Sequence, residues 1–451
     1  MLISVGGFPI ILLWLLFGGV FFTLRFGLIN LKGLPSAIAL LRNQDSSQDT
    51  TGEVSVFAAL TTALSGTVGL GNIAGVAIAI KLGGVGAVFW MSVAAFLGMA
   101  SKFIECTLGH QYRQIAEDGT ASGGPMYYLN NGLTELGLPR LGKTLGGTFA
   151  FFCIGASFGG GNMFQVNQSF AVLTALLPAL DQYDWLFGLI VAILIGLIIL
   201  GGISRIGQVT SRLIPLMIGI YLLACLWVIC INLAQLPQAI ALIFKQAFVP
   251  TAVTGGLVGT LVIALRRSVF SHGSGLGTAA IAHAAARTEE PIKEGLVAIL
   301  EPAIDTILIC NLTALVIILT DTYGDTLPSG INGSEITTLA FSKALSWFPP
   351  VLAVVIFLFG FSTIITWSYY GEKSWGYLFG SQYTIIYKLL FLGGIVLGAI
   401  ADLDTVVDFS DTMLLAMAVP NILGCLLLSN KVAKKLNNYW LKSSLERDLS
   451  T

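Results

Sequence analysis

Charged side chains are scarce in this sequence. Only 10% of the 451 residues are Asp, Glu, Lys or Arg, whereas a soluble domain carries about 25%. Hydrophobic residues make up 55% of the chain, and the mean hydropathy is +0.85. The net charge of −1 provides no excess of basic residues for a nucleic-acid surface. This composition indicates an all-α polytopic membrane protein embedded in a lipid bilayer.

Signatures of covalent chemistry and of ATP hydrolysis are also missing. The six cysteines form no CxxC pair, so neither a disulfide framework nor a zinc site is indicated. The three histidines form no HExxH motif or other metal set, His283 is interpreted as structural, and no Walker motif occurs. We therefore expect no enzyme and no ATP-driven pump. Movement of a small solute remains as the favoured activity.

A potassium-channel filter is only partly matched. Thr67-Val68-Gly69-Leu70-Gly71 is similar to the TVGYG filter. A filter needs a re-entrant loop between two flanking helices and four copies around an axis, whereas this motif occurs once inside a long apolar segment. An ion channel therefore stays an alternative to a transporter, and saturable uptake would distinguish the two.

Long apolar segments fill most of the chain and leave no room for a soluble domain. A spanning helix needs about 20 mainly apolar residues. The sequence predicts about 11 transmembrane helices, at 8–30, 55–81, 84–109, 146–179, 184–201, 211–234, 254–286, 295–320, 348–371, 384–400 and 410–429. The first lacks a basic n-region and outlasts a signal peptide, so we interpret it as a retained helix.

The distribution of basic residues predicts the orientation. With the N-terminus outside, all but five of the 23 lysines and arginines lie on the cytoplasmic side, Lys102 among them. The five exceptions are Lys81, Lys245, Lys343, Arg266 and Arg267. We therefore expect a multi-pass protein of the cell inner (plasma) membrane, with its N-terminus outside and its C-terminus in the cytoplasm.

Two of the apolar segments are rich in glycine at their centres. The second carries Gly66, Gly69, Gly71 and Gly75, and the seventh carries glycines at 273, 275 and 277. Each glycine costs about 1 kcal/mol in a helix interior, so these segments are predicted to unwind. Non-helical backbone at membrane depth must line a cavity or be buried. Close helix packing is the alternative reading.

The positions of these two segments predict an internal repeat. Without the first segment, ten remain, and the glycine-rich ones are the first and the sixth. Each group contains five helices. Because an odd number of crossings ends on the opposite side of the membrane, the second group must run inverted to the first, as in many secondary transporters. The predicted divisions are 1–54 (extra helix and cytoplasmic connection), 55–234 (first repeat), 254–429 (second, inverted repeat) and 430–451 (cytoplasmic tail).

Several blocks resemble, in order, those of the alanine or glycine:cation symporter family. They are GTVGLGNIAGVAIAI, GGVGAVFWMSVAAFLGMASKFIECTLGHQYR, GGPMYYL, GNMFQVNQ, FSHGSGLGTAAIAHAAA, EPAIDTILICNLTAL and WSYYGEKSWGYLFG. The resemblance spans about Gly66 to Asn421. It implies sodium-coupled, sometimes proton-coupled, uptake of alanine, glycine or a similar small amino acid. It also implies a fold similar to the leucine-transporter type, in agreement with an inverted 5+5 repeat preceded by one extra helix.

The sequence departs from that family beside the second glycine cluster. The family usually shows FSNEAGLGS, where this chain has His272, Gly273 and Ser274 in place of Asn-Glu-Ala. The change removes a carboxylate and adds a possible titrating group. A glutamine-type or proton-coupled symporter of the same fold therefore stays open beside the alanine or glycine symporter.

The expected substrate site lies at the two breaks. A zwitterionic amino acid needs both donors and acceptors, which Asn72 offers, although it could also cap the restarted half-helix. By resemblance, Gln165 contacts the substrate, and Trp367 walls the pocket or serves only in packing. The remaining expected substrate-binding positions are Gly69, Gly71, His272, Gly275 and Gly277.

Oxygen ligands are expected for sodium, the coupling ion. Ser362 and Thr363 lie in an otherwise apolar helix that, in the leucine-transporter-type arrangement, faces the first break. Carbonyls near Gly66 and Gly69 would complete the shell, whereas hydroxyls bonded to their own helix are the alternative. Two further groups carry buried charge, Glu301 with Asp305 and Arg266 with Arg267, and are interpreted as network or gate partners.

Overall fold

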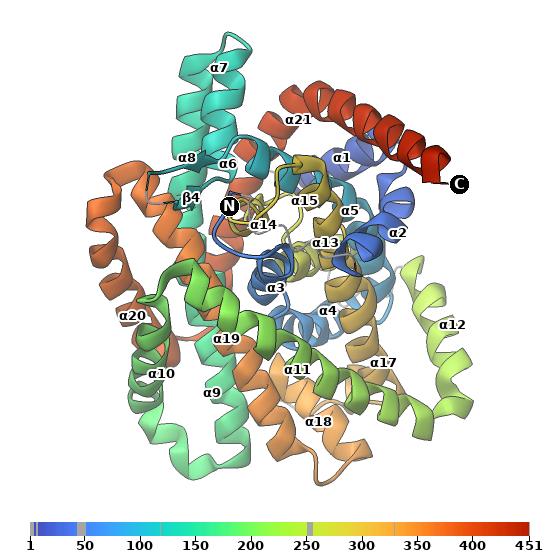
Figure 1. Cartoon of the computed structure of the whole chain (residues 1–451). Helices are drawn as coiled ribbons and strands as arrows, with labels where there is room; N and C mark the ends of the chain where they lie inside the picture. Colours follow the sequence, from blue (N-terminus) through green and yellow to red (C-terminus); the bar gives the residue numbers. More distant parts are fainter. Residues whose placement is uncertain are drawn as a thin grey trace.

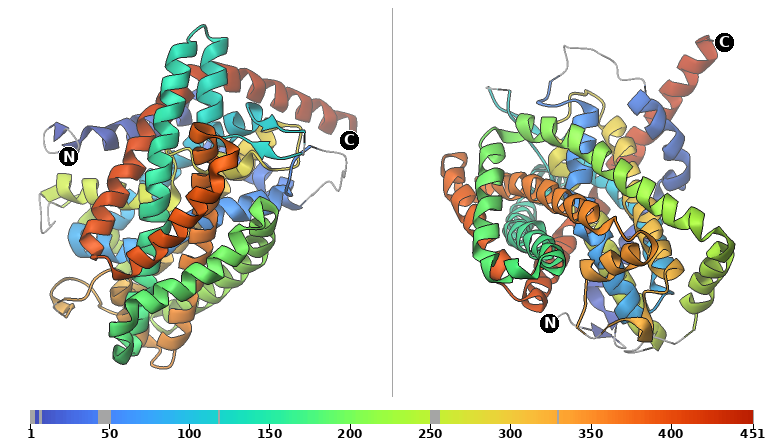
Figure 2. Two further views of the ribbon diagram at one scale, coloured as in Figure 1. Left: turned by 90° about the vertical axis from the view of Figure 1, so that its left-hand side faces the viewer. Right: turned by 90° about the horizontal axis from the view of Figure 1, so that it is seen from below.

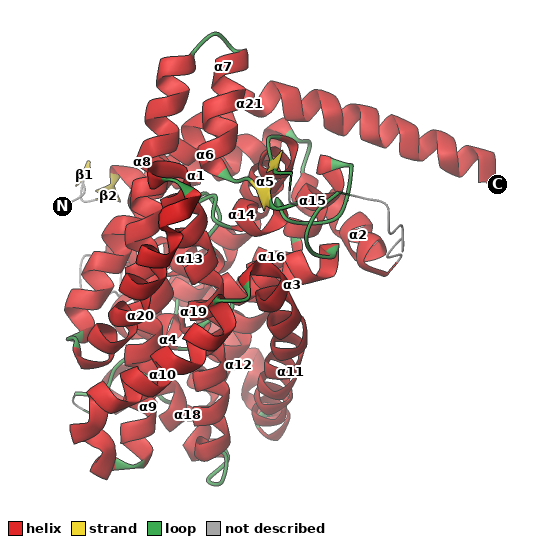
Figure 3. Cartoon of the chain, turned by 60° about the vertical axis from the view of Figure 1, so that its left-hand side comes forward, coloured by secondary structure: helices red, strands yellow, loops and turns green. Residues whose placement is uncertain are grey.

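The computed structural model describes residues 4–5, 8–42, 51–117, 119–249, 256–328 and 330–450, without the side chains of residues 4, 5, 8, 325 and 443–450. Helices make up nearly all of this part of the chain (Figure 3). The described strands form two short antiparallel pairs, β1 (Ser4–Val5) with β2 (Phe8–Pro9) and β3 (Gln114–Ile115) with β4 (Ala121–Ser122).

The first repeat begins with a broken helix. Its elements are α3 (Val56–Thr67), η1 (Leu70–Asn72), α4 (Ala74–Gly83), α5 (Ala87–Gln111), α8 (Pro139–Phe158), η3 (Gly159–Met163), α9 (Phe164–Leu176), α10 (Asp184–Ile199) and α11 (Gly202–Ile231). The axis turns by 55° between Val56–Thr67 and Leu70–Gly83. The predicted break at the first glycine cluster is therefore confirmed.

The second repeat begins in the same way. Its elements are α13 (Gly256–His272), α14 (Ala279–His283), α15 (Pro291–Ala298), α16 (Leu300–Pro302), η6 (Ala303–Cys310), α17 (Asn311–Leu319), α19 (Pro349–Phe379), α20 (Thr384–Ile400) and α21 (Leu403–Ser450). Six residues, 273–278, separate α13 from α14, which confirms the second predicted break.

The remaining helices precede the two repeats or connect their elements. They are α1 (Ile10–Arg25), α2 (Ile29–Arg42), α6 (Pro125–Tyr127), η2 (Tyr128–Gly132), α7 (Leu133–Glu135), η4 (Pro178–Tyr183), η5 (Leu233–Gln235), α12 (Leu236–Ala247), η7 (Gly324–Thr326), α18 (Ser334–Ala344) and η8 (Ser381–Tyr383). Figure 1 shows α12 standing at one edge of the body. In Figure 2 the end of α21 extends away from the bundle as a single helix.

Corresponding helices of the two repeats pack against each other. α5 contacts α15, α8 contacts α19, and α10 contacts α20. The broken helices cross in opposite directions, because α3 contacts α14 whereas α4 contacts α13. This pairing of the first half of one broken helix with the second half of the other is what an inverted repeat requires.

The number of spanning helices differs from the sequence prediction. Among the described residues, eight helices are long and apolar enough to cross a membrane, or ten when each of two bent pairs counts as one. The predicted segment 254–286 falls short because α13 has 17 residues, roughly 26 Å at 1.5 Å per residue. The predicted first segment also bends, by 73°, into α2.

Candidate functional site

The break in the first repeat is held by Asn72. Its Oδ1 accepts a hydrogen bond from the Gly69 backbone N–H at 3.1 Å, which caps the short turn η1. Its Nδ2 donates to the Asp305 carboxylate at 2.5 Å and to the Asp305 carbonyl at 3.1 Å. Asn72 therefore has both the capping role and a tie to the second repeat, and it is 1% exposed.

The break in the second repeat depends on glycine. Gly273, Gly275 and Gly277 have φ angles of 62°, 85° and 82°, in the left-handed region that other residues rarely occupy. The carbonyl of Gly275 accepts a hydrogen bond from Asn421 Nδ2 at 2.8 Å. The chain can leave the helix here because a side-chain amide replaces a lost backbone partner.

An amide from the third helix of the first repeat reaches the first break. Gln165 Oε1 accepts from the Leu70 backbone N–H at 3.2 Å, and its Nε2 donates to the Gly160 carbonyl at 2.8 Å. The π-helical turn η3 immediately precedes it. One step from Gln165, Phe164 packs edge-on against Phe270, with ring centroids 4.9 Å apart. The site therefore has an aromatic wall beside its amide.

Helix α19 supplies the opposite wall. Trp367 Nε1 donates to the Gly66 carbonyl at 2.8 Å. Thr363 Oγ1 donates to the Ser65 carbonyl at 2.9 Å and to Phe359 O in its own helix at 3.0 Å. The Ser362 hydroxyl bonds only within its helix, but the Ser362 carbonyl accepts from Ser65 Oγ at 2.7 Å. Oxygen atoms of α3 and α19 thus converge just before the break.

Most of the expected site residues therefore gather around one point. The structure brings together Gly66, Gly69, Asn72, Gln165, Thr363 and Trp367. Gly71 lies nearby against Phe270. Gly275 and Gly277 lie on another side of the second break, beside Asn421.

His272 lies apart from this group. Its ring faces Gly98 of α5 and, with Ser101 and Ser274, lines a cavity of about 20 Å³ closed by leucines of α1. Its Nδ1 accepts from the Ser274 backbone N–H at 2.9 Å. His272 and Ser274, which depart from the family pattern, therefore lie between the second repeat and the extra N-terminal helix α1.

A group of buried charges went unrecognised in the sequence. Lys102 was assigned to the cytoplasmic surface, but its side chain is 0% exposed and forms a salt bridge of 2.9 Å with Glu301. Glu301 also contacts His283 at 2.9 Å, and the other ring nitrogen of His283 contacts Glu294 at 2.7 Å. The EPAID block signals Glu301, and the position of Lys102 inside the predicted segment 84–109 is a signal too, but its partner is 199 residues away and could not be predicted.

Of the two predicted charge groups, Glu301 and Asp305 take different partners, whereas Arg266 and Arg267 both lie near Asp411. Glu301 belongs to the charged group just described, whereas Asp305 binds Asn72 and the Ser271 hydroxyl at the break. Arg267 forms a buried ion pair with Asp411 of α21, and Arg266 lies 3.9 Å from the same carboxylate. Arg267 therefore joins the first and the last helix of the second repeat, α13 and α21.

Another arginine, Arg113, binds the chain next to α3 and α14, at the ends of these helices that lie away from the breaks. Arg113 donates to the carbonyls of Ala284, Ala286 and Thr288, at 3.0, 2.6 and 3.0 Å. It also donates to the carbonyl of Thr51 at 2.9 Å. Arg113 thus joins the end of α5 to the chain before α3 and to the chain after α14.

Two inverted repeats, each opened by an unwound helix, together with a polar site at the breaks define a secondary transporter of the leucine-transporter fold. The solved structure titled "Crystal structure of MhsT in complex with L-phenylalanine" shares this fold, with a TM-score of 0.58, 15% identity and coverage of 84% of this chain and 89% of that one.

The family follows from the sequence comparison. The profile of the sodium:alanine symporter family matches residues 3–450. The sodium/alanine symporter AgcS of Methanococcus maripaludis is 39% identical over 95% of this chain and 93% of its own length. The probable sodium/glutamine symporter GlnT of Bacillus subtilis is 34% identical over 97% and 89%. This chain belongs to the sodium:alanine symporter family, and it is a membrane transporter, not an enzyme.

Proposed function

We propose that this protein is a sodium-coupled symporter that carries a small neutral amino acid, alanine or glycine, into the cell. The observation that carries the proposal is the convergence of Gln165, Thr363 and Trp367 on the unwound turn that follows α3. The relatives named for sodium and for alanine or glutamine support the same reading.

The substrate would bind where backbone and amide groups meet. Amides at Gly69 and Gly71 and the side chains of Asn72 and Gln165 would hold the carboxylate and the ammonium group. Trp367 limits the pocket, because a Cβ on Gly161 would already overlap its ring. Gly275 and Gly277 would contribute through their backbone only. We expect a site narrowed by the contact between Gly161 and Trp367 to accept an amino acid with a small side chain.

The histidine at the second break enters this proposal only indirectly. Because its ring faces α5 and α1, His272 would influence the site through the conformation of 273–278. A glutamine-type substrate would require room beyond Gly161 and Trp367, which are in close contact. Alanine or glycine therefore stays the favoured substrate.

Sodium would bind between α3 and α19. The Thr363 hydroxyl and the carbonyls of Ser65 and Gly66 would supply the hard oxygen ligands that sodium prefers. The Thr363 hydroxyl already lies 2.9 Å from the Ser65 carbonyl, and the Gly66 carbonyl accepts from Trp367 of the same helix. Ser362 would contribute by rotation of its hydroxyl, which now bonds within α19. One sodium ion entering at 100 mV and down a tenfold gradient provides roughly 3.7 kcal/mol, enough for a several-hundred-fold solute gradient.

Uptake into proteoliposomes tests this proposal. The full chain is purified, reconstituted, and supplied with radiolabelled alanine, glycine or glutamine, with and without an inward sodium gradient. We expect saturable uptake of alanine or glycine that depends on the gradient. Currents of single-channel size without saturable uptake would instead identify a channel, and sodium-independent uptake would overturn the coupling.

The orientation belongs to the same proposal. We place the N-terminus outside the plasma membrane and the C-terminus in the cytoplasm, because the basic residues of the tail after Asn430 and of α2 then lie inside. Labelling of single cysteines introduced near either end with an impermeant reagent on intact cells tests this assignment.

A further inference from the structure

Five ionisable side chains are buried together beside the broken helix of the second repeat. They come from three regions of the chain: Lys102 and Glu105 on α5, His283 at the end of α14, and Glu294 and Glu301 on α15 and α16. Each is at most 1% exposed. Isolated charges at this depth are costly, so their charges must balance.

His283 must carry or share an additional proton. Its Nδ1 lies 2.7 Å from Glu294 Oε2, and its Nε2 lies 2.9 Å from Glu301 Oε1. An ionised carboxylate only accepts hydrogen bonds, and a neutral imidazole has only one N–H. Both contacts are therefore satisfied when His283 is an imidazolium ion.

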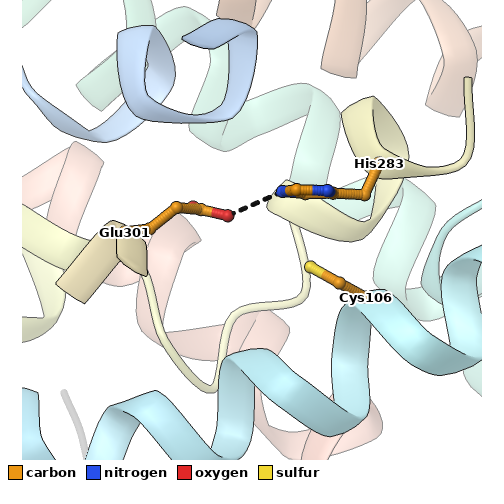
Figure 4. A group of neighbouring side chains, drawn as sticks. All are labelled: Cys106, His283 and Glu301. Atoms are coloured by element: carbon orange, nitrogen blue, oxygen red, sulfur yellow. Dashed lines mark hydrogen bonds and ion pairs between the residues drawn. The ribbon is translucent and has the colours of Figure 1, made fainter. Parts of the chain in front are cut away.

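A metal ion does not explain this cluster. Cys106, His283 and Glu301 place their possible ligand atoms within 4.8 Å of one another, as Figure 4 shows. However, the His283–Glu301 contact is 2.9 Å, whereas two ligands of one tetrahedral zinc ion lie roughly 3.3 Å apart. Lys102 also neutralises the same carboxylate. The distances from His283 to Glu294 and Glu301 are those of hydrogen bonds.

The cluster lacks one positive charge. Lys102 and imidazolium His283 supply two, whereas Glu105, Glu294 and Glu301 supply three negative charges when ionised. Glu294 and Glu301 each have a cationic partner within 4.0 Å, and Glu105 has none among the described residues. One further proton on Glu105 makes the group neutral.

The hydrogen bonds of Glu105 agree with a protonated carboxyl. Its Oε1 accepts one neutral N–H, from Asn421 Nδ2 at 2.8 Å, and its Oε2 is buried without a partner. By contrast, Asp305 Oδ1 accepts three hydrogen bonds, from Asn72, Ser271 and Thr306, although its Oδ2 is also buried without a partner. Glu105 is therefore the carboxyl that requires a proton.

Other groups around the cluster do not supply the missing charge. The groups that face it from the packed elements are Cys106 and His110 on α5, Tyr128 on η2, Tyr370 on α19 and Cys425 on α21. The nearest additional cation, Arg113, has no carboxylate within 4.0 Å among the described residues, and its guanidinium donates to carbonyl and hydroxyl oxygens.

Glu105 is also linked, through one side chain, to the unwound stretch 273–278 of the second repeat. The Nδ2 atom of Asn421 that binds Glu105 also donates to the Gly275 carbonyl at 2.8 Å. Loss of the Glu105 proton would strengthen its hold on Asn421 and change the support of the unwound stretch 273–278. The protonation state of Glu105 and the conformation of the second break are therefore coupled.

We propose that Glu105 is the binding site of a proton that is cotransported with the amino acid. The proton is taken up from the outside by the Glu105 carboxylate, is held while the Arg113 side is closed, and is released to water when that side opens. This inference rests on the proposed amino-acid symport, and it adds a second coupling ion to the sodium site at Thr363.

Substrate uptake and luminal pH, recorded together, test the inference. Proteoliposomes holding the full chain and a pH-sensitive dye receive alanine or glycine under a sodium gradient, with the membrane potential clamped. We expect the lumen to acidify with uptake, and uptake to vary between about pH 5.5 and 8.5, a range that spans perturbed carboxyl titrations. In Glu105→Gln, we expect uptake to become independent of pH and acidification to be lost.

Two further variants test whether the effect depends on a titrating carboxyl at position 105. Glu105→Asp retains a titrating group, so acidification should return. Glu135→Gln is the matched control, because Glu135 is exposed and a hydrogen bond from Lys431 lowers its pKa, which keeps it ionised throughout. If Glu105→Gln fails to transport, proton uptake from a weak buffer on addition of amino acid to the purified protein replaces transport as the readout. We expect this proton uptake in the parent and not in Glu105→Gln, and equal proton uptake in both would overturn the inference.

The outcomes separate this inference from the function on which it rests. Sodium-driven uptake in the parent without acidification, or equal acidification in Glu105→Gln and the parent, would overturn the proton site alone. No uptake of any amino acid by the parent would overturn the symport proposal and the proton site with it.

Discussion

At the residue scale, the site uses each polar side chain as a support for unwound backbone. Gln165 illustrates this, because its two amide atoms bind Leu70 N–H on the break and the Gly160 carbonyl on its own helix. A buried amide that lost one of these partners would be costly. Binding and folding demands on Gln165 are therefore combined in one side chain.

Gln165→Ala should weaken substrate binding. It leaves the Leu70 N–H without a buried acceptor, at a cost of about 1–3 kcal/mol, so the KM for alanine or glycine should rise by roughly tenfold to a hundredfold. Asn167→Ala is the control on the same helix, because that amide binds the Ala401 carbonyl instead. Equal KM values in both variants would remove Gln165 from the substrate site.

Thr363→Ala should act on sodium dependence. The hydroxyl links α19 to the Ser65 carbonyl of α3, so its loss should raise the sodium concentration for half-maximal uptake by about tenfold, the effect of 1.4 kcal/mol. Ser368→Ala removes a hydroxyl of the same helix that bonds only to Ile365 O. Sodium titrations of uptake compare the two, and an unshifted titration in Thr363→Ala would contradict the sodium site.

At the element scale, helices approach closely where glycine removes side chains. Gly161 in the turn η3 lies directly against Trp367 of α19, so that a Cβ would overlap the indole. In the absence of a hydrophobic drive between helices within lipid, small residues allow such close packing. The glycines of η3 therefore allow α19 to pack closely, and the same close contact narrows the site.

Gly161→Ala should lower both stability and uptake. Overpacking of this kind costs about 1–3 kcal/mol, and displacement of Trp367 would break its hydrogen bond to the Gly66 carbonyl. Gly147→Ala on α8 is the control, since the nearest atom to a Cβ there is Leu378 Cδ2 at 3.9 Å. Thermal unfolding in detergent measures the difference, and equal Tm values would contradict the packing argument.

At the scale of the whole molecule, two arginines join segments that are far apart in the sequence. Arg267 pairs with Asp411 between α13 and α21, whereas Arg113 joins α5 to the segments that flank α3 and α14. We expect these two contacts to close the site between the breaks on opposite sides. Transport requires that one of these contacts opens while the other stays closed.

Arg113→Ala should favour opening on the side of the buried charge cluster. It removes hydrogen bonds to Thr51, Ala284, Ala286 and Thr288, so water and small reagents should reach the native Cys106. We expect alkylation of Cys106 by a maleimide to be several-fold faster than in the parent. Arg140→Ala, on the exposed start of α8, is the control, and Cys106→Ser identifies the labelled position.

The sequence alone determined the architecture because membrane insertion is decided locally. Apolar length, glycine clusters and their positions predicted the inverted repeat, since backbone in lipid must stay helical wherever it is not buried in protein. The exact span count was not predicted, because bends such as that between α1 and α2 depend on packing.

The tertiary structure decided which side chains meet. Asn72, Gln165 and Thr363 carried local signals of polarity in apolar helices, and they converge as expected. Lys102 and His283 also lie in predicted apolar segments, but their partners could not be predicted, because a buried ion pair depends on residues that meet only on folding. The orientation of His272 toward α1 was likewise set by folding. Local composition predicts where a helix breaks, but only the packed bundle determines which charges share its interior.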